Sequence, residues 1–337
     1  MTKKTLPTYN NLEEKSKLFR IEYINTEKEF DVFFDTHTIS NGIYRGINSS
    51  QYKIYTSLQR SIITNDLQSV NYNDYIEKVI QHKNLKKYFE NFKIPLSKLS
   101  ILSYIQHYGG PSPLLDFAYN IKNALYFAVE NLPDKHEEKN NINDFFSVFF
   151  INQGDIELLE ISRVFESLKE QKELGKKIFS GYDDYSDDLL VSHIDKMLDI
   201  NTLDVFLIDN NLNFTDVYNT YNNIRIISQE GLFINNSHNT RPLEENLRVF
   251  FQEATQYQVS PWDDIDTPQA EKINAEYEEQ LKINKKYQER LKSNIITSFE
   301  INKSLASYIK EKIKINKEDI YPNSEDIIKN IFREITK

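Results

Sequence analysis

The spacing of hydrophobic residues predicts three amphipathic helices in the first half of the chain. Apolar side chains recur on one helical face over residues 73–88, 97–108 and 120–130. The second helix is expected to stop at Gly109-Gly110-Pro111, and the third ends before Pro133. The intervening stretch PSPLLDFAY is predicted to be a compact turn.

Runs of aromatic and β-branched residues predict strands between and after these helices. The clearest run covers residues 145–151, and its nearly continuous apolar character is typical of a strand at the centre of a sheet. Shorter runs predict strands at 203–208, 224–227 and 231–234. The alternation at residues 19–24 suits a short strand or the entry to a helix.

Two charged segments interrupt this pattern and are predicted to be helical insertions, at about residues 166–200 and 264–294. The segment 298–335 is expected to contain a strand, a helix around 304–314, a turn at Tyr321-Pro322 and a closing helix. The mixture of helices and strands without a strict period predicts an α+β fold. We expect one main domain over residues 38–335, preceded by an N-terminal lead-in of residues 1–37.

The composition excludes several kinds of site. The 337 residues are 39% hydrophobic, which is enough for a large core, and contain no cysteine. A disulfide framework, a thiolate nucleophile and a sulfur-ligated zinc site are therefore excluded, and a reducing, cytoplasmic location is expected. The start of the chain has no apolar run typical of a secretory signal, and residues 145–151 are too short to span a membrane.

The charge balance bears on possible partners. With 41 basic and 51 acidic residues, the chain has a net charge of -10, which disfavours broad DNA binding. A nucleic-acid-binding protein is a weaker alternative, and it would need the lysines of 282–292 and 310–317 to form one positive face. No membrane partner is expected, and the sequence leaves open a homo-oligomer.

An ordered series of motifs resembles the FRG domain family. The earlier blocks are Tyr44-Arg45-Gly46, Arg60, Gln106-His107-Tyr108-Gly109 with Pro111, Leu114-Leu115-Asp116, and Asn123-Ala124-Leu125-Tyr126-Phe127-Ala128. The later blocks are Arg225 with Gln229-Glu230-Gly231-Leu232-Phe233, and the segment from Ile301 through Tyr321-Pro322. Two positions depart from the family, which usually has Thr-Arg at Ser112-Pro113 and Trp-Thr at Phe117-Ala118.

The order of the FRG blocks is in turn remotely similar to that of ADP-ribosyltransferases. This resemblance implies a mixed, strongly curved and split sheet, flanked by helices, that holds NAD as a substrate in a cleft. It further implies an effector of the toxin or antiphage defence type, acting on a protein or nucleic acid in a bacterial cytoplasm. The alternative is a non-catalytic FRG module that binds a nucleotide-like ligand or a partner protein.

Arg45 is the first candidate for ligand binding. Its guanidinium, placed between Tyr44 and Gly46, could hold a pyrophosphate with two hydrogen bonds, while Gly46 lets the backbone come close. The structural alternative is a buried arginine that pairs with Asp116 and organises the fold.

Three further candidates come from the motif blocks around residues 106–116. His107 could donate to a ribose hydroxyl and Tyr108 could stack on a base, or His107 could cap its helix while Tyr108 lies in the core. Asp116 could cap a helix, bind substrate, or pair with Arg45 or Arg225, and pairing is preferred.

Gln229 and Glu230 are the candidates for catalysis. They lie between two predicted strands, where alternation directs them to opposite faces, so only one of them faces a given cleft. Glu230 is the residue that could stabilise positive charge on a ribose as nicotinamide leaves, whereas the family more often has the glutamine. The six histidines are scattered without ligand spacing, so no metal is expected.

Overall fold

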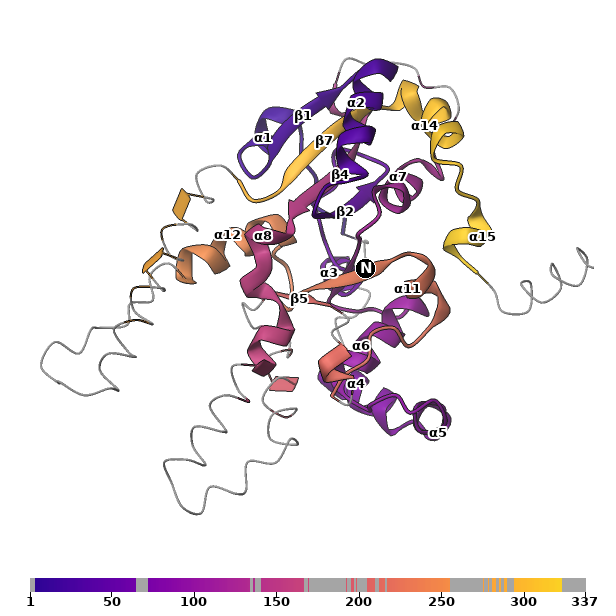
Figure 1. Ribbon diagram of the computed structural model, residues 1–337, viewed down its shortest axis with the longest axis vertical. Coiled ribbons are helices and arrows are strands. Elements are labelled where there is room, and N and C mark those ends of the chain that lie inside the picture. Colours follow the sequence, from indigo (N-terminus) through magenta and orange to yellow (C-terminus); the bar gives the residue numbers. More distant parts are fainter. Residues whose placement is uncertain are drawn as a thin grey trace, which may run out of the picture.

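The computed structural model describes residues 4–64, 72–133, 136, 141–166, 169, 192, 195–196, 198, 205–209, 212–215, 217–254, 275, 278, 281–282, 285, 288–289 and 294–322. Within these residues, seven strands form one sheet in the order β1-β7-β4-β2-β3-β6-β5. β1 runs parallel to β7, and the other neighbouring strands are antiparallel. The predicted α+β fold with a mixed sheet flanked by helices is therefore confirmed (Figure 1). The strands are β1 Arg20–Ile24, β2 Gly42–Ile47, β3 Leu114–Ala118, β4 Phe145–Asn152, β5 Val205–Ile208, β6 Gly231–Asn236 and β7 Thr297–Asn302.

The sheet consists of two halves that meet at a single residue pair. β4 pairs with β2 over six positions, and β3 pairs with β6 over five. Between the halves, β2 and β3 are paired only at Tyr44 and Ala118 in the register of the described strands. Because strands that part after one pair leave backbone groups without ladder partners, this junction is where side chains must complete the hydrogen bonding.

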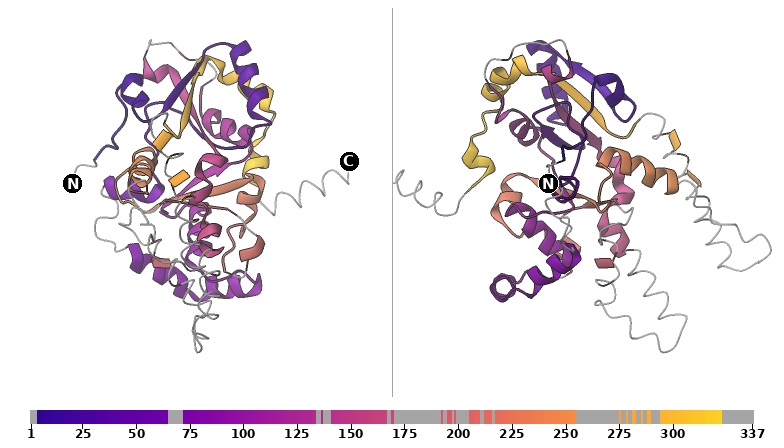
Figure 2. Two further views of the ribbon diagram at one scale, coloured as in Figure 1. Left: turned by 60° about the vertical axis from the view of Figure 1, so that its left-hand side comes forward. Right: turned by 180° about the vertical axis from the view of Figure 1, so that it is seen from behind.

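Helices cover the outer faces of both halves, as Figures 1 and 2 show. On the half that contains β2, β4 and β7, one hydrophobic cluster joins the sheet to α2 (Glu27–His37), α7 (Ile121–Val129) and α14 (Ala306–Ile313). On the half that contains β3, β6 and β5, a second cluster packs against α4 (Tyr72–Gln81), α5 (Lys83–Asn91) and α6 (Lys98–His107). Side chains alternate between the two faces of a strand. The apolar strand residues that do not face these helices therefore point to the opposite face of the sheet.

The residues on this opposite face form a third cluster shared by the two halves. It contains Ile43 and Phe149 from one half, Leu115 and Ile234 from the other, and Leu247 from α12 (Leu243–Ala254). The remaining elements are short: α1 Leu12–Ser16, α3 Ser57–Ile63, α8 Gln153–Ile156, α11 Ile224–Ser228, α15 Lys317–Ile320, and the 3₁₀ helices η1 Ile142–Asp144, η2 Glu157–Leu159, η3 Leu212–Phe214 and η4 Lys303–Leu305.

Most predicted elements are confirmed, with ends shifted by a few residues. The strand predictions at 145–151, 203–208 and 231–234 correspond to β4, β5 and β6, and of the two alternatives for 19–24, a strand or the entry to a helix, the structure has the strand β1. β4 is buried along most of its length, as its aromatic run predicts. The helix predictions at 97–108 and 120–130 correspond to α6 and α7, whose first turns are capped by the side chains of Ser97 and Asn120.

Three secondary-structure predictions are wrong. The isoleucine-rich segment 224–227 belongs to helix α11 and not to a strand, because the Asn223 side chain accepts hydrogen bonds from the first backbone N–H groups of that helix. The helix predicted at 73–88 is divided into α4 and α5 at His82, which has extended backbone angles. The predicted turn PSPLLDFAY contains strand β3, since its backbone pairs with β6.

Other predictions fall partly or wholly outside the described residues. These are most of the insertions at 166–200 and 264–294, and the closing helix after Tyr321-Pro322. Residues 20–24 of the N-terminal lead-in form β1 and pair in parallel with β7. Among the described helices, none combines the length and the apolar character that crossing a membrane would require.

Candidate functional site

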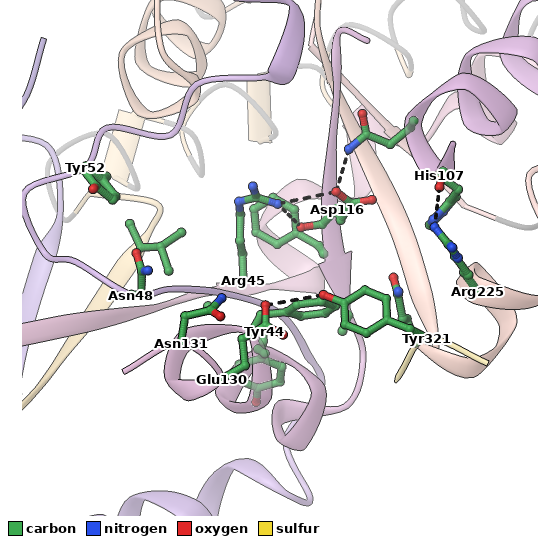
Figure 3. Close-up of a pocket in the computed structure, with 18 residues that line it drawn as sticks. Tyr44, Arg45, Asn48, Tyr52, His107, Asp116, Glu130, Asn131, Arg225 and Tyr321 are labelled. Carbon is green, nitrogen blue, oxygen red and sulfur yellow. Dashed lines mark hydrogen bonds and ion pairs between the residues drawn. The ribbon is translucent and has the colours of Figure 1, made fainter. Parts of the chain in front are cut away.

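A pocket with a volume of about 420 Å³ opens where β2 and β3 part. This volume lies in the range that small-molecule sites occupy. The pocket is lined by residues from β2, β3, α7, the end of α6, α11 and the segment after α15, which are distant in sequence (Figure 3). Of the predicted site residues it brings together Tyr44, Arg45, Gly46, His107, Asp116, Arg225 and Gln229.

Arg45 occupies the gap between the two diverging strands. Its Nη1 donates a hydrogen bond of 2.5 Å to the backbone oxygen of Asp116. This bond connects β2 to β3 just beyond the Tyr44–Ala118 pair, where the strand ladder has stopped. The Asp116 carboxylate lies 4.0 Å from the same nitrogen, at the limit of an ion pair. The predicted pairing of Arg45 with Asp116 therefore exists, and its closest contact is to the backbone.

The hydrogen-bonding capacity of Arg45 is largely unused. Burial lowers the pKa of its guanidinium to about 10, although Asp116 raises this pKa and Arg60 lowers it further. The group remains cationic at neutral pH. Its Nε is buried and has no hydrogen-bond partner in the described part of the chain. A buried donor without a partner costs about 1–3 kcal/mol, so the guanidinium favours an additional acceptor at the pocket.

His107 is the last residue of α6, and its ring is 9% exposed at the pocket wall. Burial lowers its pKa, which Asp116 raises and Arg225 lowers further. The ring is therefore neutral at physiological pH, and its buried Nε2 has no partner among the described residues. The Arg225 Nη1 donates a 2.9 Å hydrogen bond to the His107 backbone oxygen. Thus Arg225, and not the His107 ring, supplies the cation at the end of α6.

Asp116 holds a second pocket residue in place. Its Oδ2 accepts a 2.7 Å hydrogen bond from the Gln106 amide, on the last turn of α6. The predicted alternative partner, Arg225, bonds instead to the backbone of His107. Asp116 therefore ties both Arg45 and the end of α6 to strand β3, as Figure 3 shows.

Gly46 and Tyr44 serve packing on the other side of β2. A Cβ atom on Gly46 would lie 1.8 Å from the backbone oxygen of Ala124, so the glycine is required for the close approach of α7. The Tyr44 ring packs against Phe150 and His37, and its hydroxyl donates to the His37 backbone oxygen. The backbone approach predicted for Gly46 is thus made by a helix of the same chain.

Gln229 and Glu230 have different surroundings, as predicted. The reason is not alternation along a strand, because both residues lie at the end of helix α11 and before strand β6. Gln229 is the C-terminal cap of α11, lines the pocket, and donates through Nε2 to the Ile320 backbone oxygen at 3.2 Å. Glu230 has a positive φ of 47°, which turns the chain into β6. Its side chain is exposed outside the pocket lining, and it accepts a 3.4 Å hydrogen bond from Asn120. The structure does not bring the predicted catalytic Glu230 to Arg45.

Tyr108 also lies outside the pocket lining. Its ring is 60% exposed and stacks on Tyr104 with the ring centroids 4.4 Å apart. Because Tyr108 is the C-terminal cap of α6, it follows the pocket residue His107 by one position and projects to the surface. Neither the predicted stacking on a ligand in this pocket nor the predicted core position matches this location.

Sequence reasoning missed the part of the pocket formed by Phe127, Glu130, Asn131 and Tyr321. The Tyr321 hydroxyl donates a 3.4 Å hydrogen bond to Glu130, and burial raises the pKa of that carboxyl. The Tyr321 ring meets the Phe127 ring edge to face. Phe127 and Tyr321 belong to motif blocks already recognised, so their membership of two separate blocks was the available signal.

The described residues add two observations on other kinds of site. They contain no group of three or more histidine, aspartate or glutamate side chains placed to hold a metal ion. Of the lysines at 310–317, Lys310 donates to the Leu132 backbone oxygen and Lys312 pairs with Asp31. The other run of the nucleic-acid alternative, 282–292, falls mostly outside the described residues.

Comparisons with known proteins identify one part of the chain. The searches of the curated proteins and of the solved structures found no match to the chain. The family model of the FRG domain matches residues 40–138, a span that includes β2, α6, β3 and α7. Arg225, Gln229 and Tyr321 complete the pocket from outside that span. The chain therefore contains an FRG domain at residues 40–138, and this domain supplies Arg45, His107 and Asp116 to the pocket.

Proposed function

We propose that the FRG domain binds a nucleotide-like small molecule in the Arg45 pocket. The observation that carries this proposal is the state of the Arg45 side chain, which lines the pocket, is 18% exposed and has its nearest carboxylate 4.0 Å away, while its buried Nε has no partner among the described residues. Among the described residues, Nη1 is the one nitrogen of this side chain with a hydrogen-bond partner. A phosphate oxygen from a ligand would satisfy a planar guanidinium better than the carboxylate 4.0 Å away does.

The other walls of the pocket match the remaining parts of a nucleotide. Phe127 and Tyr321 offer aromatic rings, which pack favourably against the flat face of a base. Four side-chain amides and one carboxylate suit the hydroxyls and amino groups of a ribose or base: Asn48, Gln106, Asn131, Gln229 and Glu130. The lining thus combines the cations Arg45 and Arg225, an aromatic wall, two carboxylates and several amides, which together can bind this class of ligand.

Calorimetric titration of the whole chain with AMP, ADP-ribose and NAD tests this proposal. We expect at least one of these ligands to bind, and Arg45→Ala to weaken that binding on the order of tenfold or more, since it removes a charge-assisted hydrogen bond. Arg45→Lys keeps the charge but lacks the planar guanidinium, so its affinity should lie between those of the wild type and Arg45→Ala. Arg20→Ala is the matched control, because Arg20 is exposed and pairs with Glu22 far from the pocket.

Circular dichroism of each variant separates lost binding from lost folding. Equal affinities of folded Arg45→Ala and wild type would contradict the proposal, as would the absence of binding by all three ligands. In either case Arg45 would be assigned to connecting β2 with β3.

A second candidate function, NAD-dependent ADP-ribosyl transfer, is favoured by Glu130. This carboxylate lines the pocket, whereas Glu230 does not. In such a reaction the bond between nicotinamide and ribose breaks, and nicotinamide leaves with the electron pair. A carboxylate stabilises the positive charge that develops on the ribose, and an acceptor nucleophile then adds and loses its proton. The protein would in that case act as a toxin-like or antiphage effector on a protein or nucleic acid.

Measurement of nicotinamide release distinguishes the two candidates. If the chain is a transferase, Glu130→Gln should lower the rate on the order of 100-fold or more, as removal of a charge-stabilising group typically does. Glu230→Gln should have the wild-type rate, because its side chain is exposed outside the pocket. If the chain binds NAD but releases no nicotinamide, either with or without added acceptors, the transferase is rejected and the non-catalytic binding module is supported.

A further inference from the structure

Four aromatic rings form a continuous row across helices α5 and α6. Going from one end to the other, the centroid distances are 4.8 Å between Phe92 and Tyr88, 5.5 Å between Tyr88 and Tyr104, and 4.4 Å between Tyr104 and Tyr108. Tyr88 and Tyr104 lie on α5 and α6, and Phe92 and Tyr108 are the C-terminal caps of these two helices. We call these four residues the aromatic row.

The two ends of the aromatic row are exposed to solvent. Phe92 is 67% exposed and Tyr108 is 60% exposed, whereas the neighbouring Phe89 is 1% exposed and belongs to the core. The Tyr88 hydroxyl donates to the backbone oxygen of Asn222, which fixes the middle of the row. Core packing therefore uses Phe89, and the terminal rings of the row have faces without a packing function in the described structure.

The segment from α4 to the end of α6, which contains the row, has a charge opposite to that of the chain. Residues 72–108 contain six lysines and three acidic residues, a net charge of +3 in a chain whose total is -10. Lys83, Lys87 and Lys93 are exposed, and none has a hydrogen-bond or ion-pair partner in the described part of the chain. A locally positive surface attracts polyanions even when the whole protein is acidic.

We propose that the aromatic row and the surrounding lysines bind single-stranded nucleic acid. Bases have two flat faces and stack on exposed rings such as those of Phe92 and Tyr108, while the lysines attract the phosphates. A duplex conceals its base faces and would offer only the second of these interactions. A protein partner would suit the rings, but it would not by itself account for the concentration of unpaired lysines around them.

This inference does not depend on the proposed function of the pocket. The row lies outside the pocket lining, although Tyr108 follows the pocket residue His107 directly in sequence. It also gives Tyr108 a role in base stacking at the surface. The lysines concerned differ from those at 282–292 and 310–317, which composition alone had singled out.

Fluorescence anisotropy with labelled ten-nucleotide thymidylate and uridylate oligomers tests the proposal on the whole chain. We expect Tyr108→Ala and Phe92→Ala each to weaken binding on the order of tenfold, because stacking of one base is lost. Tyr108→Phe should bind as wild type does. Tyr23→Ala is the matched control, since Tyr23 is a 51% exposed tyrosine on β1.

The contribution of charge has its own pair of variants. Lys87→Glu should weaken binding several-fold and reduce its dependence on salt, because one phosphate contact is lost. Lys28 is an exposed lysine on α2, and Lys28→Glu should change binding little. All these side chains are exposed, and thermal unfolding would verify that the variants fold.

Two results would overturn the proposal. One is the absence of oligomer binding by the wild-type chain at low salt, which would leave the row as a surface for a protein. The other is equal affinity for a duplex of ten base pairs and for the single strand, with no effect of Tyr108→Ala or Phe92→Ala. That result would show non-specific attraction to the lysines without stacking.

Discussion

Lys15 is fully buried and Arg45 is partly buried, and these two cations are paired in different ways. Lys15 is 0% exposed, and its Nζ lies 2.6 Å from Glu300, 2.7 Å from the Ser147 hydroxyl and 3.1 Å from the Ser50 backbone oxygen. Glu300 in turn accepts hydrogen bonds from Ser50, Ser147 and Ser298. We call these five residues the Lys15 cluster. Arg45, in contrast, lies beside a pocket with its nearest carboxylate at 4.0 Å, and its Nε has no partner in the described part of the chain.

This difference separates a structural charge from one available to a ligand. In the Lys15 cluster, both ions have close partners within the protein, so the cluster can connect α1, β4 and β7 without a ligand. At Arg45, one hydrogen bond joins two strands, while the buried Nε has no acceptor among the described residues. Burial of a charge is therefore weak evidence for a binding site, and incomplete pairing next to a cavity is stronger evidence.

Substitution of Lys15 should give the largest loss of stability. Lys15→Met leaves the Glu300 carboxylate buried without its cation, and we expect the free energy of unfolding to fall by about 3–5 kcal/mol. Urea denaturation at neutral pH measures this change. The double variant Lys15→Met with Glu300→Gln removes both charges and should recover part of the loss. A loss below about 1 kcal/mol in Lys15→Met would contradict the structural role of the cluster.

A second buried acid on this side of the molecule, Glu244, should make stability depend on pH. It accepts a 2.6 Å hydrogen bond from the Tyr9 hydroxyl, and burial raises its pKa to about 6 from 4.5. The folded state therefore binds more protons than the unfolded state between these values. The resulting contribution is largest below pH 4.5 and disappears as the pH rises through 6, a change of about 2 kcal/mol.

The variant Glu244→Gln isolates this effect from other titrating groups. Its side chain is neutral at every pH, so the difference in unfolding free energy between wild type and variant should decrease by about 2 kcal/mol from pH 4 to pH 7. Denaturant unfolding at both pH values provides the measurement. A constant difference over this range would show that Glu244 is not protonated preferentially in the folded state.

Arg45→Met should have the smallest effect on stability among the substitutions considered at Lys15, Glu244 and Arg45. The substitution removes the hydrogen bond to the Asp116 backbone oxygen, but it also removes the cost of the unpartnered Nε. These terms partly cancel, and we expect a loss of about 1 kcal/mol in the same urea experiment. A loss as large as that of Lys15→Met would erase the distinction between the two cations, and Arg45 would then be primarily structural.

Local patterns predicted most of the elements, and they failed where a single side chain or long-range pairing intervened. The helices α6 and α7 and the strand β4 follow from apolar spacing and the residues that end them. The segment 224–227 has the composition of a strand, yet the cap at Asn223 makes it helical. Strand β3 lies in the proline-containing stretch PSPLLDFAY, whose composition predicts a turn, and its pairing with β6 makes it a strand.

The candidate site was predictable only as far as its motifs extend. The motif blocks placed Arg45, His107, Asp116, Arg225 and Gln229 together, and the structure has all five in one pocket. It excludes Tyr108 and Glu230 from that lining because each lies at a helix end, where backbone angles and not strand alternation decide the direction of the side chain. Glu130 and Tyr321 are neighbours although 191 positions separate them in sequence.

Residue types and short-range spacing are sufficient to predict the α+β class, the lack of cysteine chemistry and the FRG motifs. Three features of the pocket follow only from the folded chain: β2 and β3 part after one residue pair, Arg45 bridges the gap, and Tyr321 closes the opposite wall. These features depend on contacts between residues far apart in the chain, and packing of the two sheet halves around a shared core sets those contacts.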